Sequence, residues 1–378
     1  METPLIVPQG QFQLQRLPYR KHELLRAWDA ADEYLLNHFA EHCKPVTNAK
    51  IVIVNDSFGG LAVALADYQP IAISDSYLSQ QATQLNLLAN QRNPEQVLLL
   101  DSLSLPDAEI DYLLIKAPKT LALLEYQLHR LRPLLKPDCI VIVAGMVKNL
   151  PPTLWKILEK LIGPTKPSIA VKKARMIFAE LDSALSIPLN PYPTDYLLEG
   201  TEIVISNHAN VFSRDSLDIG TRFLLQHLPS NRAYQEFIDL GCGNGVVGLS
   251  IARQLPEANL CFVDESFMAL ASAKQNFVSA LSVNRSAKFV AADCLNGFAA
   301  NSADCVICNP PFHQQHTVGD HIAWQMFQQA HKVLRVGGEL RVIGNRHLHY
   351  HSSLKKLFGN CRQIAANAKF VIFSSQKS

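Results

Sequence analysis

The sequence contains one pattern twice, and this repeat restricts the fold more than any other feature. In the first half, the apolar run 51–54 leads through a pair of glycines into a helix-like segment, and residues 237–245 begin the same pattern in the second half. The matching downstream segments are 71–76 with 260–265, 111–119 with 304–312, and 140–145 with 340–344. Short apolar strands that alternate with amphipathic helices are typical of a parallel, doubly wound sheet. We therefore predict an α/β protein with two tandem Rossmann-like domains.

The domain boundary is expected at a cluster of prolines. A chain of 378 residues is too long for one ordinary domain. Pro188, Pro191 and Pro193 interrupt any regular element in residues 187–195. We therefore predict a first domain over 1–186, a proline-rich linker over 187–195 and a second domain over 196–378.

The second copy carries a glycine turn followed by strand-end carboxylates. The turn Gly241-x-Gly243-x-Gly245 lets backbone amides approach a ligand closely. By itself the turn fits a nicotinamide enzyme as well as a methyltransferase, because Gly243-x-Gly245-x-x-Gly248 matches the dinucleotide pattern. Carboxylates also end the three predicted strands of this copy, where ligands of doubly wound sheets bind. These are Asp239, Asp264 and Asp293.

The motif Asn309-Pro310-Pro311-Phe312 follows the apolar run 305–308 and favours the methyltransferase. An exocyclic amine on a nucleobase is a poor nucleophile, because its lone pair is delocalised into the ring. The Asn309 side-chain oxygen and the Pro310 carbonyl can accept from such an amine and aim its lone pair. The prolines stiffen the loop, and Phe312 can stack on an unpaired base. We therefore expect S-adenosylmethionine as methyl donor, with Asp264 on its ribose hydroxyls and Asp293 near its adenine.

A polar segment before the glycine turn, residues 207–215, is a candidate cover for the donor. Phe212 would pack on the methionine chain, and Arg214 would meet its carboxylate or an RNA phosphate. The same segment also reads as a helix N-terminus capped by Ser213 or Asp215.

The first copy differs where the chemistry would lie. We align Ser57, Phe58 and Leu61 with the positions of Gly241, Cys242 and Gly245, so bulky side chains would crowd a ligand. The first copy is therefore predicted to be degenerate, without a donor. Its basic residues suit a phosphate backbone or, equally, a solvated helix face. The candidate RNA-binding residues are Lys116, Lys119, Lys148, Lys172, Lys173 and Arg175.

Metal binding and membrane insertion are not expected. The spacing Cys305-x-x-Cys308 resembles half of a metal site, but residues three apart on a strand face opposite sides and no second pair follows. No apolar run is long enough to span a membrane, and the N-terminus lacks a signal peptide. Cytoplasmic localisation is expected.

Together, the repeat, the 207–214 segment, the glycine turn and residues 309–316 resemble the bacterial ribosomal RNA guanine-N2 methyltransferases over nearly the whole chain. The resemblance implies class I methyltransferase domains, a first domain used for RNA binding, and methylation of one guanine in 23S rRNA, naked or in an assembling subunit. From the residues we expect no metal, and no obligate protein partner is evident in the sequence. The donor would be held by Asp239, Gly241, Gly243, Asp264 and Asp293, and the target base by residues 309–312.

Other functions remain open from the sequence. The alternatives are a 16S rRNA guanine-N2 methyltransferase, a glutamine-N5 protein methyltransferase and a DNA adenine methyltransferase. Phe312 and the duplicated first half argue against the glutamine enzyme, which usually carries tyrosine at that position. An RNA-binding assembly factor with a vestigial site is the non-enzymatic alternative.

Overall fold

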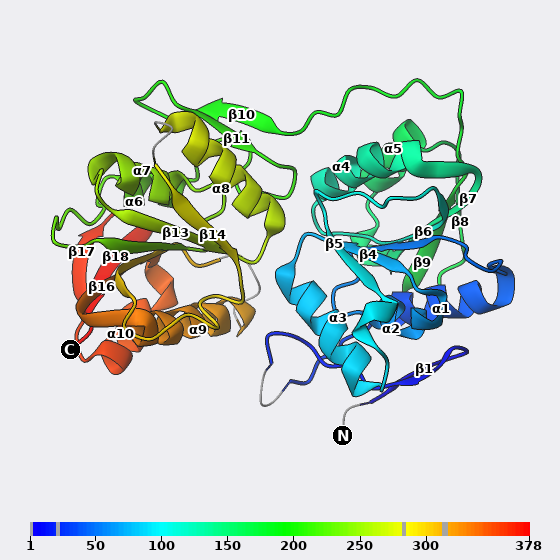
Figure 1. Cartoon of the computed structure of the whole chain (residues 1–378), viewed down its shortest axis with the longest axis horizontal. Coiled ribbons are helices and arrows are strands. Elements are labelled where there is room, and N and C mark those ends of the chain that lie inside the picture. The colour runs from blue at the N-terminus through cyan, green and yellow to red at the C-terminus, as the bar shows by residue number, and fades with distance from the viewer. Residues whose placement is uncertain (1–2, 20–22, 282–284, 312–316) are drawn as a thin grey trace. The chain divides into compact units, whose positions relative to one another are not determined.

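The computed structural model describes residues 3–19, 23–281, 285–311 and 317–378. The chain divides into two compact units, Met1–Tyr192 and Pro193–Ser378 (Figure 1).

The first unit is a seven-stranded sheet with helices on both faces. Its strand order is β5-β4-β3-β6-β7-β9-β8; β3 to β7 are parallel, and β9 pairs antiparallel with both of its neighbours, β7 and β8. Helices α1, α2 and α3 pack on one face, and α4 and α5 on the other. The strands are β1 Leu5–Val7, β2 Gly10–Phe12, β3 Ile51–Val54, β4 Ile71–Ser74, β5 Leu98–Asp101, β6 Ile110–Lys116, β7 Leu135–Met146, β8 Thr165–Pro167 and β9 Ala174–Ala179. The helices are α1 Ala30–His42, α2 Gly60–Ala64, α3 Tyr77–Ala89, α4 Leu121–Leu131 and α5 Pro152–Leu161.

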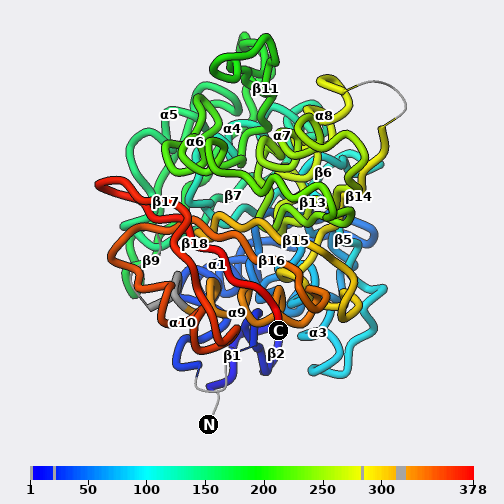
Figure 2. Tube along the Cα trace, turned by 90° about the vertical axis from the view of Figure 1, so that its left-hand side faces the viewer, coloured from blue at the N-terminus to red at the C-terminus, as the bar shows by residue number. Residues whose placement is uncertain are grey.

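The second unit repeats this arrangement with the strand order β14-β13-β12-β15-β16-β18-β17. Figure 2 follows its last strand, β18, which runs antiparallel beside β16 towards the C-terminus. The strands are β10 Thr194–Leu197, β11 Val204–Asn207, β12 Glu236–Leu240, β13 Asn259–Asp264, β14 Ala287–Ala291, β15 Ala303–Cys308, β16 Leu334–Asn345, β17 Arg362–Ala366 and β18 Phe370–Gln376. The helices are α6 Ile219–Leu225, α7 Val246–Gln254, α8 Phe267–Ala280, α9 Thr317–Val333 and α10 Tyr350–Phe358. The predicted fold class is confirmed.

Both sheets follow from the burial of their central strands. Every residue of β3, Ile-Val-Ile-Val, is buried, as expected for a parallel strand covered on both faces. Several helices begin with an N-cap residue whose side chain accepts from a backbone N–H of the first turn. These residues are Asp29 for α1, Ser76 for α3, Asp218 for α6 and Ser266 for α8.

The structure corrects the alignment of the two glycine turns. The Asn55 N–H donates to Ile73 O at 3.0 Å, and the Gly241 N–H donates to Val263 O at 2.8 Å, so Asn55 and Gly241 are equivalent. Gly59 and Gly245 then coincide, and both begin a helix with positive φ, 80° and 77°.

Leu61 therefore lies inside α2 and does not occupy the Gly245 position, as the sequence alignment had it. Phe58 corresponds to Asn244, whereas Asn55 and Ser57 replace Gly241 and Gly243. The alignment of the next strand was also wrong by one residue. Ser74 is equivalent to Asp264, because each accepts from the N–H of the helix-capping serine two residues later.

The first unit fills its own turn with a carboxylate. Asp56 is 7% exposed and accepts N–H donors from Gly60, Leu61 and Ala62 at the start of α2. Burial, reinforced by Asp32, raises the pKa of Asp56 to about 6. A helix start that already binds an internal carboxylate has its amides satisfied. This supports the predicted loss of ligand binding in the first unit.

Candidate active site of the second unit

The candidate site lies at the carboxyl ends of β12, β13 and β15. The chain leaves β12 towards β13 and β14, then returns to β15 on the other side of β12. This reversal is the topological switch point at which doubly wound sheets bind ligands. The glycine turn follows β12, Asp264 ends β13, and Asn309 follows β15.

The three glycines of the turn have different roles. A Cβ on Gly243, where φ is +54°, would meet no atom within 4 Å, so this residue borders open space. A Cβ on Gly241 would meet only the end of Met326, at 3.3 Å. A Cβ on Gly245 would lie 2.7 Å from Ala273 Cβ in α8. Gly241 and Gly243 therefore leave room for a ligand, whereas Gly245 allows α7 to pack against α8.

Asp239 lies beneath the turn. Its side chain is 4% exposed, and its Oδ2 accepts from Gly248 N–H at 2.8 Å. Burial raises the pKa of Asp239 to about 7. In this geometry the carboxyl group fixes the start of α7 from below.

The buried Asp239 carboxyl should make stability depend on pH. In the unfolded chain its pKa is about 3.9, so between roughly pH 4 and 7 the folded state holds a proton that the unfolded state has lost. Stability is therefore lost as pH rises through this window. Asp239→Asn should remove that loss. Between pH 4 and 8 its free energy of unfolding should therefore rise relative to that of the native protein, by up to about 4 kcal/mol.

Urea unfolding of both proteins across this range measures the difference. Asp195→Asn, at an exposed position in the same unit, is the control and should run parallel to the native protein. If the free energy of unfolding of Asp239→Asn also ran parallel to that of the native protein across this pH range, the raised pKa of Asp239 would be contradicted.

Asp264 connects β13 to the glycine turn. Its Oδ2 accepts from Gly243 N–H at 2.9 Å and its Oδ1 from Ser266 N–H at 3.0 Å. Burial raises its pKa. Two oxygens held at the rim of the open turn are suited to accept hydroxyl donors.

Asp293 lies two residues beyond β14. Its Oδ1 accepts from Gln325 Nε2 in α9 at 2.8 Å, and burial raises its pKa. The two carboxylates are therefore brought to the same edge of the sheet as the glycine turn.

Asn309 has one satisfied and one unsatisfied side-chain group. Its Nδ2 donates to Thr221 Oγ1 in α6 at 3.0 Å. Its Oδ1 is buried and has no hydrogen-bond partner among the described residues. An unsatisfied buried acceptor costs about 1–3 kcal/mol, which a ligand donor would relieve. Pro310 is buried and Pro311 is exposed. Phe312 lies outside the described residues.

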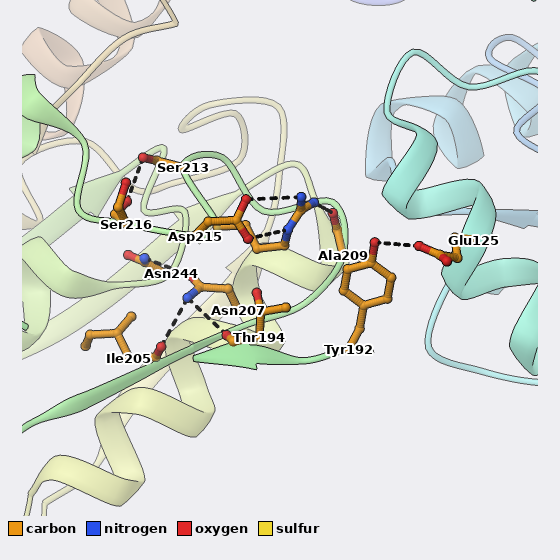
Figure 3. A network of polar contacts seen from close by, with 11 residues as sticks. Glu125, Tyr192, Thr194, Ile205, Asn207, Ala209, Ser213, Asp215, Ser216 and Asn244 are labelled. Carbon is orange, nitrogen blue, oxygen red and sulfur yellow. Dashed lines mark hydrogen bonds and ion pairs between the residues drawn. The ribbon is translucent and has the colours of Figure 1, made fainter. Parts of the chain in front are cut away.

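The 205–216 segment is tied to the glycine turn by asparagines (Figure 3). Asn207 Oδ1 accepts from Asn244 Nδ2 at 2.9 Å, and Asn207 Nδ2 donates to Ile205 O at 3.1 Å. Asn276 in α8 bonds both backbone groups of Ser206, at 2.7 and 3.0 Å, and donates to Asn244 O at 2.9 Å. This network fixes the segment beside the turn.

The two residues expected to cover the donor follow this network. Phe212 is 61% exposed. Arg214 donates to Ala209 O at 2.9 Å and pairs with Asp215 (Figure 3). Neither Ser213 nor Asp215 caps a helix; α6 is capped by Asp218 instead.

Sequence reasoning did not assign roles to Asn207, Asn244, Asn276 or Thr221. One signal was available for Asn276, because the repeat places Asn86 at the same position in the first unit. Asn86 bonds Gln15 and Phe58 O as Asn276 bonds Ser206 and Asn244 O. Thr221 had no such signal, because it lies 88 residues from Asn309 in the chain.

The candidate RNA-binding residues of the first unit fall into two groups. Lys116, equivalent to Asn309, has a side chain that is 14% exposed, and its Nζ lies 2.9 Å from Asp29 and 2.7 Å from Asp32, so its ammonium is already paired. Arg175 is half-buried in β9. The others are exposed at or near the carboxyl edge: Lys119 after β6, Lys148 after β7, and Lys172 and Lys173 before β9. Val147 N–H donates to Lys173 O, which joins two of these turns, and Lys172 pairs with Glu33 at 2.8 Å.

The cysteine prediction is confirmed in its geometry. Cys305 and Cys308 are both buried in β15 and belong to separate core clusters on opposite faces of the sheet. Within the described residues, no helix combines the length and the apolar character needed to cross a bilayer.

Comparisons with known proteins agree with the division of the chain into two units. The RLMG N-terminal domain family matches residues 2–183, and the Methyltransferase small domain family matches residues 202–374. Among solved structures, a 16S rRNA N2 methyltransferase (RsmC) from T. thermophilus, in complex with AdoMet and guanosine, has a similar fold. The TM-score is 0.76 at 19% identity, over 100% of this chain and 98% of the other.

Curated relatives are similar over their whole length. Ribosomal RNA large subunit methyltransferase G of Pseudomonas paraeruginosa is 49% identical over 98% of both chains. The protein of the same name from Aeromonas salmonicida is 46% identical over 100% of both chains. With both family matches in the expected order, the chain belongs to the ribosomal RNA large subunit methyltransferase G family.

Proposed function

We propose that the second unit transfers a methyl group from S-adenosylmethionine to the exocyclic N2 of one guanine in 23S rRNA. The observation that carries this proposal is the buried Asn309 Oδ1, which has no hydrogen-bond partner among the described residues and follows β15 at the same edge of the sheet as the open glycine turn. An acceptor that lacks a donor is suited to an amine. The names of the full-length relatives support ribosomal RNA of the large subunit as the substrate.

The residues present fit the donor. Gly243 leaves space for it, and the Asp264 carboxylate lies at the rim of that space. Gly241, Asp239 and Asp293 complete the proposed donor site with Gly245, which acts through helix packing, and with Phe212 and Arg214 from the covering segment. S-adenosylmethionine supplies an electrophilic methyl group when bound.

The protein's part in the reaction is orientation. Asn309 Oδ1 and the Pro310 carbonyl each accept a hydrogen bond from the target amine. These two hydrogen bonds reduce delocalisation of the nitrogen lone pair and direct it towards the methyl group. Pro310 and Pro311 restrict the loop, so the acceptors are in place before the base arrives. Phe312 is proposed to stack on the base, which must be unpaired or flipped out.

Transfer of labelled methyl to purified 23S and 16S rRNA that lack native methylation tests the proposal. N2-methylguanosine in 23S rRNA alone is the expected result. Label in 16S rRNA would favour the small-subunit alternative, which the fold of RsmC makes worth testing. Label only in a release factor or in DNA would overturn the ribosomal assignment.

The first unit is proposed to hold RNA through its exposed lysines at the carboxyl edge. Lys119→Ala with Lys148→Ala should weaken 23S rRNA binding and reduce the slope of log K against log salt by about 2, one for each lost phosphate contact. Filter binding at several salt concentrations measures this. Lys44→Ala with Lys50→Ala removes the same charge near the opposite edge, where β3 begins, and should leave the slope unchanged. Equal slopes for both double variants would contradict an RNA role for the carboxyl edge.

The protein is expected to act in the cytoplasm, where ribosomal RNA is modified. The form of the RNA, naked or within an assembling large subunit, follows from the same transfer assay run on both substrates.

A further inference from the structure

A hydrogen-bonded chain of three residues ends at the catalytic asparagine. Asp218 caps α6, and Thr221 lies in its first turn. Thr221 Oγ1 lies 3.2 Å from Asp218 Oδ2 and donates its hydrogen to it. Asn309 Nδ2, from the end of β15, donates to the same Oγ1 at 3.0 Å. Thr221 is 8% exposed, so water does not compete freely for its hydroxyl.

The direction of these hydrogen bonds fixes the orientation of the Asn309 amide. An ionised carboxylate only accepts, so the single hydroxyl hydrogen of Thr221 is used on Asp218. The Thr221 oxygen can then only accept, and the amide must present its nitrogen to it. The Asn309 Oδ1 is consequently turned away from Thr221, and it has no partner among the described residues.

We propose that Thr221 and Asp218 are positioning residues that hold the Asn309 amide with its oxygen towards the target amine. Without them the amide can rotate by half a turn, and Asn309 Nδ2, a donor, would then face the target amine, which is also a donor. The inference rests on the proposed role of Asn309 in methyl transfer.

The first unit supports the inference independently. There, Asp29 caps α1, Asp32 occupies the position of Thr221, and Lys116 occupies the position of Asn309. Lys116 Nζ contacts Asp32 at 2.7 Å. The two positions hold threonine and asparagine in the second unit, and aspartate and lysine in the first. In each unit, the residue in the first turn of the helix therefore contacts the residue at the carboxyl end of the equivalent strand, β6 or β15, and an acceptor faces a donor.

Asp218 also caps α6 by accepting from Thr221 N–H at 2.8 Å, so a structural role must be separated from a positioning role. Thr221→Val keeps the shape but removes the hydroxyl, and Thr221→Ser keeps the hydroxyl. Thr83→Val, at a buried threonine of the first unit that bonds Ser79 O, is the matched control. The measurements are kcat and KM for 23S rRNA, the Kd for S-adenosylmethionine, and thermal unfolding.

Thr221→Val is expected to lower kcat about 10-fold, which corresponds to one orienting hydrogen bond. KM and the donor Kd should stay within about 2-fold of the native values, because neither depends on the amide orientation. Thr221→Ser should recover kcat, and Thr83→Val should leave it unchanged. An unchanged kcat for folded Thr221→Val, or no recovery by Thr221→Ser, would overturn the proposal.

Two further outcomes are distinguishable. If Thr221→Val does not fold, Asp218→Asn decides, because asparagine still caps a helix but no longer forces the hydroxyl direction. Reduced kcat then supports the proposal, and native kcat overturns it. Failure of the native protein to form N2-methylguanosine would instead contradict the proposed function itself.

Discussion

Asn309→Ala is expected to lower kcat for methyl transfer at least ~100-fold, because removing one preorganised hydrogen-bonding group from a reaction site costs about 10²–10³-fold. The variant removes the buried acceptor, Asn309 Oδ1, for which the described part of the chain offers no hydrogen-bond partner. The Pro310 carbonyl would remain as the only proposed acceptor, so the amine would be held by one contact instead of two. Its lone pair would no longer be directed.

The donor should still bind this variant normally, because the glycine turn and Asp264 are unchanged. Single-turnover transfer to 23S rRNA and calorimetric titration with S-adenosylmethionine measure the two effects separately. Asn259→Ala replaces an exposed asparagine at the opposite end of the same sheet, where β13 begins, and is the control. A transfer rate for Asn309→Ala within a few-fold of this control would refute the proposed role of Asn309.

Lys116→Met is expected to destabilise the first unit by about 3–5 kcal/mol, the usual cost of leaving one partner of a buried ion pair alone. Asp32 is 5% exposed and would lose its counter-ion, and Asp29 would lose one of its partners. Although burial disfavours the ammonium, Asp32 and Asp29 outweigh this and raise the pKa of Lys116. The lysine is therefore charged at neutral pH, and its removal unbalances the site.

Hydrogen exchange of the full chain, read on peptides from the first unit, measures this loss. Lys119→Met, at an exposed position three residues later, should have almost no effect. The double variant Lys116→Asn with Asp32→Thr copies the Asn309–Thr221 pair of the second unit and should recover much of the stability. Equal protection in Lys116→Met and Lys119→Met would show that the buried pair does not support the fold.

The equivalent positions of Lys116 and Asn309, at the carboxyl end of the same strand in each unit, thus have different consequences. In the second unit the position holds Asn309, whose buried Oδ1 has no partner within the described residues and is proposed to receive the target amine. In the first it holds a lysine whose charge is neutralised internally, and Asp56 satisfies the helix start above the glycine turn. A duplicated domain that fills its own ligand positions keeps its fold without a ligand. Its exposed lysines are then available for another task.

The sequence alone determined the class of fold and the places along the chain of the strands that carry the motifs. Apolar runs alternating with helical segments allow few arrangements, and two copies of the pattern imply two sheets. The opposite facing of Cys305 and Cys308 also followed from the alternation of side chains along a strand. These features depend on local periodicity, which a sequence displays directly.

The tertiary structure decided the register of the glycine turns and the neighbours of each polar group. Gly59 matches Gly245 because each must let a helix pack against the next, at Thr83 and Ala273 respectively, and that contact is distant in the chain. Lys116 carries a positive charge in the sequence, and only the position of α1 shows that Asp32 neutralises it. Likewise, Asn309 could be recognised from its motif, whereas the orientation of its amide depends on Thr221, which the fold brings beside it.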